Sequence, residues 1–181
     1  MSIKYAYLGP AGTFTEAALQ KIATPSDQLI AYANVTAALD AVRNGGCQKA
    51  LVPIENSVEG VVARTLDELA IGQPLVITAE TTLPVTFSLM TLSNTNAAEI
   101  KSIATHPHAE SQCRSFIANN YPNAQVIESS STAAAAKGLS KGDYDAAIAG
   151  SNAANNYNLK VIAENIGDNT GAVTRFVLVE K

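Results

Sequence analysis

The sequence contains only two cysteines, two histidines and no tryptophan in 181 residues, which limits the chemistry that it can support. Cys47 and Cys113 lie far apart, without C-x-x-C spacing, so a disulfide framework is not expected. His106 and His108 form an H-x-H pair, but no cysteine and no obvious third ligand lies nearby. Because zinc sites use three or four protein ligands, we expect no metal site.

Signals for several classes of partner are also missing. No run of Lys or Arg occurs and the net charge is -4, which argues against nucleic acid or an anionic membrane as a partner. No segment approaches the roughly 20 apolar residues that span a bilayer. Residues 1–5 lack the apolar core of a secretory signal. We therefore expect a cytoplasmic protein.

The common cofactor and nucleophile motifs are absent. No G-x-G-x-x-G follows a strand, and no lysine follows residues 9–13 as it would in a phosphate-binding loop. No G-x-S-x-G elbow is present. The sequence therefore predicts a protein that uses neither a nicotinamide nor a nucleotide cofactor.

What is present is an internal repeat. The composition, 47% hydrophobic and 15% charged, is typical of a globular protein with one large domain or two small lobes. Each half follows the order strand, helix, strand, helix, strand, polar loop, helix. The expected strands are residues 3–8, 29–33, 49–54, 102–105, 125–128 and 146–149. The expected helices include residues 14–22 and 109–121, and two more that are capped by Asn34 and by residues 129–132.

This alternation predicts an α/β fold with parallel sheets and helices on both faces. Residues 74–92 read as a crossover between two similar lobes, and residues 160–181 read as the return to the first lobe. The expected domains are residues 1–78 plus 160–181 and residues 79–159, with a cleft between them.

Six polar loops fall at the carboxyl ends of the expected strands, where open α/β sheets bind ligands. They are residues 9–13, Asn34, residues 55–57, 105–108, 129–132 and 150–152. Several begin helices, whose free N–H groups favour an anion. Two interpretations stay open. Thr13 and Thr132 are either helix caps or ligand contacts, and Glu16 lies at capping-box spacing from Thr13. Glu55 and Asn56 form either a solvated turn or part of a site.

The end of the chain carries a further candidate site. A polar loop at residues 167–173 leads to a short apolar strand expected at residues 176–179, and we expect Thr174 and Arg175 side by side at the junction. A guanidinium offers a rigid fork for a carboxylate, and a hydroxyl can polarise a leaving oxygen. A structural ion pair is the alternative for Arg175. The residues thus indicate a small-anion binding protein or a cofactor-free enzyme.

Five motifs in order resemble the catalytic domain of the prephenate dehydratase family over the whole chain. They are Tyr7-Leu8-Gly9-Pro10-Ala11-Gly12-Thr13-Phe14-Thr15, Val52-Pro53-Ile54-Glu55-Asn56-Ser57-Val58-Glu59-Gly60, His106-Pro107 with Gln112-Cys113, Ser131-Thr132-Ala133, and Thr174-Arg175-Phe176. The resemblance implies two α/β lobes like those of type 2 periplasmic binding proteins. It also implies conversion of prephenate to phenylpyruvate, with loss of CO2 and water, in phenylalanine biosynthesis. Aromatisation drives that reaction, so no cofactor is implied.

The resemblance also implies roles for individual residues. Thr174, Glu55 and Asn56 are expected to be catalytic, with Thr174 hydrogen-bonding the departing hydroxyl and Glu55 either relaying a proton or fixing its loop. The residues expected to bind substrate are Thr13, Phe14, Ser57, Thr105, Gln112, Ser131, Thr132, Arg175 and Phe176. Two positions depart from the family pattern, because Ala172 replaces a common Asn and His108 replaces a frequent Gln.

Several alternatives remain open at this point. A non-aromatising prephenate decarboxylase would keep the ring hydroxyl, a small-anion binding module would not turn over, and arogenate is a second candidate substrate. Most family members continue into an ACT domain that binds phenylalanine, whereas Lys181 follows Phe176 by five residues. The chain is either part of a longer protein or a stand-alone catalytic unit, and we expect no feedback by phenylalanine. We also expect a homo-oligomer, specifically a dimer.

Overall fold

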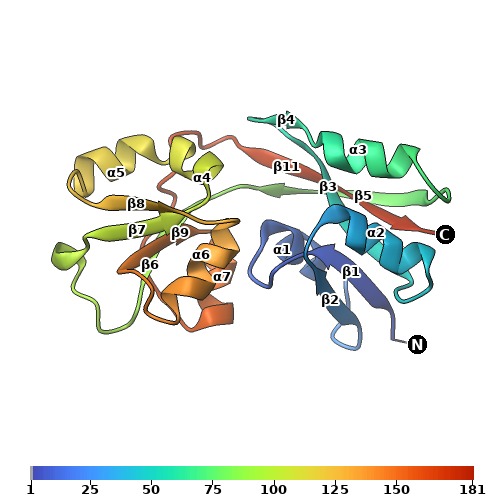
Figure 1. Cartoon of the computed structure of the whole chain (residues 1–181), viewed down its shortest axis with the longest axis horizontal. Coiled ribbons are helices and arrows are strands. Elements are labelled where there is room, and N and C mark those ends of the chain that lie inside the picture. The colour runs from blue at the N-terminus through green and yellow to red at the C-terminus, as the bar shows by residue number, and fades with distance from the viewer. Residues whose placement is uncertain (1) are drawn as a thin grey trace. The chain divides into compact units, whose positions relative to one another are not determined.

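The computed structural model of the chain describes residues 2–181, which form two compact units (Figure 1). Among the described residues, unit 1 comprises 2–10, 14–84 and 172–181, and unit 2 comprises 11–13 and 85–171. Each unit contains one β-sheet with helices packed against it.

The sheet of unit 1 combines parallel and antiparallel strands. Its order is β2 (Gln28–Tyr32), β1 (Lys4–Leu8), β3 (Lys49–Asn56), β11 (Val173–Glu180) and β5 (Val76–Pro84). Strands β1, β2 and β3 are parallel, whereas β11 runs antiparallel to both β3 and β5. A short strand, β4 (Gly60–Val61), forms a hairpin with the end of β3.

Alternating side chains divide the core of unit 1 between the two faces of this sheet. Tyr5, Tyr7, Leu51, Phe176 and Leu178 pack with α1 (Phe14–Gln20). Their neighbours in the same strands pack with α2 (Val35–Arg43) and with a residue of α3 (Ala63–Ala70). These neighbours are Ala6, Ala50, Val52, Val177 and Val179. Successive side chains of a strand point to opposite faces, so the two clusters require helices on both sides.

Helix α2 shows how the sequence sets the length of an element. Asn34 accepts a hydrogen bond from the Ala37 N–H at 2.8 Å, and this cap begins the helix as expected. Val35, Ala38, Leu39 and Val42 are buried, which is one stripe of the helical period. The helix ends at Arg43, two residues before Gly45, whose φ of +77° ordinary residues rarely adopt.

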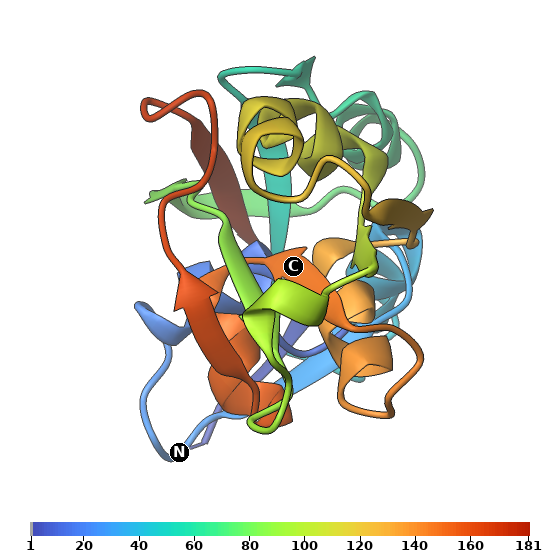
Figure 2. The ribbon, with the colours of Figure 1, turned by 90° about the vertical axis from the view of Figure 1, so that its left-hand side faces the viewer.

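Unit 2 repeats the same plan with shorter strands. Its sheet order is β10 (Lys160–Ala163), β6 (Ser88–Thr91), β9 (Ala146–Ala149), β7 (Ser102–Thr105) and β8 (Gln125–Glu128). A 3-10 turn, η1 (Ala97–Glu99), precedes β7. Helices α4 (Pro107–Gln112) and α5 (Arg114–Asn120) cover one face in Figures 1 and 2, and α6 (Thr132–Leu139) and α7 (Ser151–Tyr157) cover the other. Buried alanines of β7, β9 and α6 make this second face closely packed.

The repeated order of strands and helices in the two halves is confirmed, but the expectation of purely parallel sheets is wrong. In each sheet three parallel strands are followed by a fourth that runs in the opposite direction, and a fifth pairs antiparallel with the fourth. In unit 1 the fourth strand is β11, from the end of the chain, and in unit 2 it is β6. A strand was expected at residues 176–179, within β11, but strand and helix alternation could not reveal the antiparallel pairing, because the pairing partners lie far away in sequence.

The boundaries of the parts also differ from those expected. Strand β5 continues to Pro84 because it pairs with β11 along its length, so residues 79–84 belong to unit 1. Residues 160–163 form β10, which pairs with β6, so residues 160–171 belong to unit 2. The single helix expected at residues 109–121 is two helices, because the backbone leaves the helical conformation at Cys113.

Within residues 2–181, none of the helices combines the length and the apolar character that a membrane-spanning helix requires.

Candidate active site

In unit 2 the expected site residues stand at the carboxyl ends of β7 and β8, but much of their hydrogen bonding is internal. Thr105, the last residue of β7, is 1% exposed and donates through its hydroxyl to the carbonyl of Ile148 at 2.8 Å. This bond ties β7 to β9. Burial and this hydrogen bond give Thr105 a structural role in the core, and its expected contact with substrate stays a prediction.

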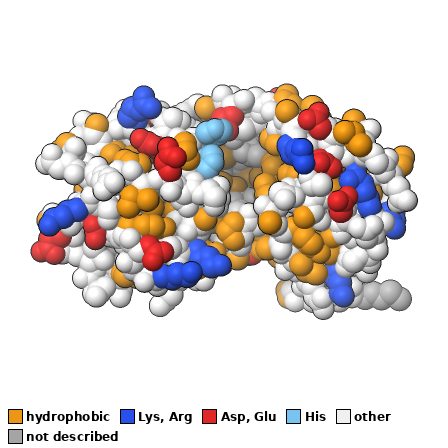
Figure 3. All heavy atoms as spheres, in the orientation of Figure 1, with side chains coloured by type: hydrophobic (Ala, Val, Ile, Leu, Met, Phe, Trp, Pro, Cys, Tyr) orange, Lys and Arg blue, Asp and Glu red, His pale blue; other side chains and the backbone are white. Residues whose placement is uncertain are grey.

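The two histidines lie together at the start of α4 (Figure 3). Their ring centroids are 4.9 Å apart in an edge-to-face arrangement, and Nδ1 of His106 accepts from the His108 N–H at 3.3 Å. Among the residues that the structure describes, no group of three or more His, Cys, Asp or Glu side chains is placed to hold a metal ion. The H-x-H spacing thus serves as a helix cap.

Gln112 is the last residue of α4 and is held by a loop that sequence reasoning did not connect with it. The Gln112 carbonyl accepts from the Asp168 N–H, and the Asp168 carboxylate accepts from the Ser115 N–H at 3.2 Å. Asp168 therefore fixes the break between α4 and α5. Burial and the neighbouring Asp168 charge raise the pKa of Cys113, at that break, to about 12, so its thiol stays protonated.

The loop at residues 11–13 belongs to unit 2 through contacts with α7. The Tyr157 hydroxyl donates to the Ala11 carbonyl at 2.7 Å, and the Asn152 side chain donates to the Thr13 carbonyl at 3.1 Å. Gly12 lies between them with φ +88°, in a region that disfavours a side chain. The polarity of Asn152 was visible in the sequence, but its contact with a segment 139 residues away was not.

Ser131 and Thr132 have different roles at the start of α6. Ser131 is the N-cap, and its hydroxyl accepts from the Ala134 N–H at 2.9 Å. Thr132 is the first helical residue. The capping role that was left open for Thr132 thus belongs to Ser131.

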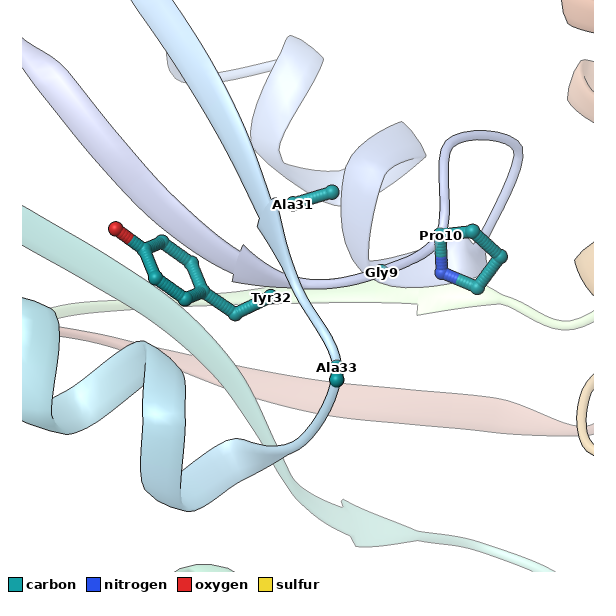
Figure 4. A pocket seen from close by; sticks show the side chains of 5 residues that line it. All are labelled: Gly9, Pro10, Ala31, Tyr32 and Ala33. Carbon is teal, nitrogen blue, oxygen red and sulfur yellow. The ribbon is translucent and has the colours of Figure 1, made fainter.

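In unit 1 a hollow of about 270 Å³ lies at the carboxyl ends of β1 and β2 (Figure 4). It is lined by Gly9, Pro10, Ala31, Tyr32 and Ala33. A Cβ atom at Gly9 would lie 2.7 Å from the Ala31 Cβ, so only glycine permits the two strands to approach this closely. The hollow occupies the sheet edge at which ligands of open α/β folds bind.

A tight turn connects β3 to β4 and places Asn56 at its first position. The Asn56 side-chain oxygen accepts from the backbone N–H groups of Val58 and Glu59, at 2.8 and 3.2 Å. Gly60 closes the turn with φ +84°. An asparagine that caps a loop and a glycine in the left-handed region are the residues this hairpin requires. The local sequence therefore builds the turn and fixes the orientation of the Asn56 amide.

The oriented amide of Asn56 meets Thr174 across the sheet. Asn56 Nδ2 donates to Thr174 Oγ1 at 2.8 Å, and the two residues are paired between β3 and β11. Because the Asn56 oxygen is already used by the turn, the amide can only donate here. Thr174 is 8% exposed. Its oxygen accepts from Asn56, so its hydroxyl hydrogen is left to donate to another group.

Glu55 and Arg175 lie on the other face of the same two strands. They are paired across β3 and β11, with Arg175 Nη2 at 3.4 Å from Glu55 Oε2 and Nη1 at 3.9 Å from Glu80 Oε2. The structure places Thr174 and Arg175 within β11, rather than at a loop junction, so their side chains point to opposite faces. The expected side-by-side hydroxyl and guanidinium are therefore not formed.

Phe14 and Phe176 are parts of one hydrophobic cluster in unit 1. Phe176 is 1% exposed and packs with Tyr5, Tyr7 and Leu178 in the core, and its expected contact with substrate stays a prediction. Phe14, the first residue of α1, is only partly buried against this cluster. Ser57, by contrast, is exposed and bonds to the backbone of Val173.

These features define the fold class to which the chain belongs. Two α/β units with mixed sheets, and with polar groups at the carboxyl ends of their parallel strands, are typical of the two-lobed binding-protein fold. In agreement, an ABC-transporter periplasmic substrate-binding protein from Coxiella burnetii has the same fold, with a TM-score of 0.50 and 13% identity over 98% of this chain and 84% of that chain. A family model described as prephenate dehydratase matches residues 5–181. The chain belongs to the prephenate dehydratase family.

Relatives over nearly the whole chain agree with that assignment. A prephenate dehydratase of Amycolatopsis methanolica is 46% identical over 178 residues, which cover 98% of this chain and 58% of the relative. A crystal structure of the Arthrobacter aurescens prephenate dehydratase in complex with L-Phe is 46% identical, with a TM-score of 0.90, over 99% of this chain and 60% of that chain. The chain thus spans somewhat more than half the length of these relatives. The expected α/β fold class and family are confirmed.

Proposed function

We propose that this chain catalyses the decarboxylative dehydration of prephenate to phenylpyruvate, as a carbon–oxygen lyase of phenylalanine biosynthesis. Membership of the family over residues 5–181 supports this reaction. The single structural observation that carries it is the hydrogen bond from Asn56 to Thr174, which leaves the Thr174 hydroxyl as a donor. A fixed hydroxyl donor suits a reaction in which an oxygen leaves with negative charge.

The reaction needs a group that assists the departing oxygen. The bond from the ring to its carboxylate breaks, CO2 leaves, and the electron pair enters the ring. The ring carbon–oxygen bond then breaks, and the hydroxide takes up a proton from solvent and departs as water. Thr174 donates a hydrogen bond to this oxygen as its charge grows. A threonine hydroxyl is too weak an acid to give up its proton fully, so its contribution is electrostatic.

Arg175 is proposed to bind a carboxylate of the substrate by reaching round the amino end of β11, because its side chain leaves the strand on the face opposite to Thr174. Its contacts with Glu55 and Glu80, at 3.4 and 3.9 Å, are longer than good hydrogen bonds, and its side chain is 46% exposed. Its donors are therefore available to an incoming anion. Glu55 holds the guanidinium in the absence of substrate, which makes positioning a better supported role for it than proton relay.

The remaining predicted residues are proposed as substrate contacts, each described within its own unit. In unit 2 they are the Gln112 side chain and the backbone N–H groups at the start of α6, where Ser131 and Thr132 stand. Thr13 and Phe14 flank the point at which the chain enters α1. These contacts orient a dianion and require no metal or organic cofactor.

Incubation of the purified chain with prephenate tests the reaction directly. We expect stoichiometric phenylpyruvate, identified by the ultraviolet absorbance of its aromatic enol after product analysis without acid. Loss of CO2 without an aromatic product would identify a non-aromatising decarboxylase instead. Saturable binding of prephenate without any product would identify a binding module. A parallel incubation with arogenate measures which of the two substrates is preferred.

We also propose that the chain acts in the cytoplasm and as a homodimer. Large apolar side chains are exposed on unit 1, which supports association. They are Val58, Val61, Leu66, Ile71, Val76 and Ile77. Light scattering coupled to size exclusion measures the mass of the assembly, and a monomer at micromolar concentration would contradict the dimer.

A further inference from the structure

Ser57 makes a two-way contact with the first residue of β11. The Ser57 N–H donates to the Val173 carbonyl at 2.9 Å, and the Ser57 hydroxyl oxygen accepts from the Val173 N–H at 2.9 Å. A single serine thus satisfies both backbone groups of the residue that precedes Thr174. The two segments lie 116 residues apart in sequence, and this contact supplements the strand pairing that begins at Thr174 and Asn56.

The contact lies beside the bond that orients Thr174. Asn56 and Ser57 are consecutive, as are Val173 and Thr174, so three hydrogen bonds join two dipeptides. The bond from Asn56 sets the direction of the Thr174 hydroxyl. The two bonds between Ser57 and Val173 fix the position and orientation of the backbone that precedes Thr174. Together they leave little freedom for the hydroxyl.

We propose that Ser57 is a positioning residue, which acts through Thr174 rather than by direct contact with the substrate. This inference rests on the proposed dehydratase reaction. It replaces the expectation, drawn from the sequence, that Ser57 binds substrate. The physical reason is that a donor must be held within a fraction of an ångström of the leaving oxygen to stabilise the transition state.

Kinetics of Ser57→Ala test the role. Loss of the hydroxyl frees the Val173 N–H, and we expect kcat to fall about tenfold while KM changes less than about twofold, because a small misplacement weakens only transition-state contacts. Ser57→Thr keeps the hydroxyl and should restore most of the turnover. Ser140→Ala is the matched control, since Ser140 is an exposed serine whose hydroxyl also bonds to one backbone group, the Lys137 carbonyl.

A double variant separates positioning from independent action. In a Thr174→Ala background, Ser57→Ala should cause almost no further loss of kcat, because the group that it positions is already absent. A full additional loss in that background would overturn the proposal. A rise in KM with unchanged kcat would overturn it in favour of substrate contact. Unchanged kcat and KM with only a lower melting temperature would reduce Ser57 to a structural role.

Amide hydrogen exchange provides a readout that does not depend on activity. We expect faster exchange of the Val173 amide in Ser57→Ala than in the unsubstituted chain, with unchanged exchange in Ser140→Ala. Equal exchange of the Val173 amide in Ser57→Ala and in the unsubstituted chain would contradict the hydrogen bond between Ser57 and Val173. Failure of the unsubstituted chain to convert prephenate would instead refute the proposed reaction, and would withdraw the positioning role even if the exchange result held.

Discussion

Unit 1 and unit 2 share a strand order, yet they use the carboxyl ends of their strands differently. In unit 1, β3 runs to Asn56, paired with β11, and presents Asn56 and Thr174 as a side-chain pair. In unit 2, β7 stops at Thr105 and passes into α4 through the capping residue His106. Polar residues at a helix start are used by the free N–H groups of the helix, whereas polar residues at a strand end keep capacity for a ligand.

The difference lies in what the polar side chains of each unit bond to. The polar side chains of unit 2 at Thr105, His106 and Ser131 bond to backbone groups of the same unit, namely the Ile148 carbonyl and the N–H groups of His108 and Ala134. In unit 1 the Thr174 hydroxyl oxygen accepts from the Asn56 side chain, which leaves its hydrogen to donate to another group. We therefore expect substitutions at Asn56 and Thr174 to affect turnover, and substitutions at the polar residues of unit 2 to affect stability or affinity.

The largest effect is expected from Thr174→Ala. Removal of the donor should lower kcat by about 10²–10³-fold, the range for loss of one preorganised donor. KM should change much less, because the hydrogen bond strengthens as the oxygen departs. Steady-state kinetics with prephenate measure both constants, and circular dichroism checks that the variant is folded. Near-normal turnover would remove Thr174 from the mechanism.

Asn56→Asp should reverse the hydrogen bond rather than remove it. A carboxylate still accepts from the Val58 and Glu59 N–H groups, so the turn should persist. The Thr174 hydroxyl would then donate to residue 56, and its donor would be lost to the substrate. We expect kcat to fall about 10²-fold, as for loss of the donor itself. If kcat falls less in Asn56→Ala than in Asn56→Asp, the direction of the hydrogen bond between residues 56 and 174 matters for turnover. A larger fall of kcat in Asn56→Ala would contradict this.

Thr105→Val tests the assignment of unit 2 residues to the fold. The substitution preserves shape but removes the hydroxyl that bonds to the Ile148 carbonyl. We expect a loss of stability of about 1 kcal/mol, which corresponds to about 2–4 °C in melting temperature for a chain of this size. Activity of the folded protein should be retained, and Thr86→Val, at an exposed position, serves as the control. A large rise in KM would return Thr105 to the site.

Arg175→Lys probes the opposite face of the β3–β11 pair. An ammonium keeps the charge near Glu55 but cannot form a bidentate contact. We expect KM for prephenate to rise about three- to tenfold, the equivalent of roughly one lost hydrogen bond, with little change in kcat. Unchanged KM would show that the ion pair with Glu55 is the whole role of Arg175.

The smallest effect is expected at Cys113. Burial raises the pKa of this thiol to about 12, so at pH 8 the protonated form dominates and the reactive thiolate is rare. Iodoacetamide should leave turnover unchanged in the native protein, and mass spectrometry should find Cys113 unlabelled until denaturant is added. Rapid native labelling with loss of activity would place a reactive thiol at the break between α4 and α5.

Local features of the sequence determined much of the fold and part of the site. Asn34 and Ser131 cap helices through bonds that span three residues, and the turn from Asn56 to Gly60 follows from its own sequence. Alternating apolar residues also marked the parallel strands of both halves correctly. Such features depend on neighbours within a few residues, so periodicity and residue type are sufficient to predict them.

Only the tertiary structure decided the chemistry at the end of the chain. Thr174 and Arg175 are adjacent in sequence, but pairing of β11 between β3 and β5 makes them strand residues that point to opposite faces. The same pairing brings Thr174 to Asn56, 118 residues away. Pairing over such a distance depends on the fit of whole strands and on burial of their alternate residues, which no short segment encodes.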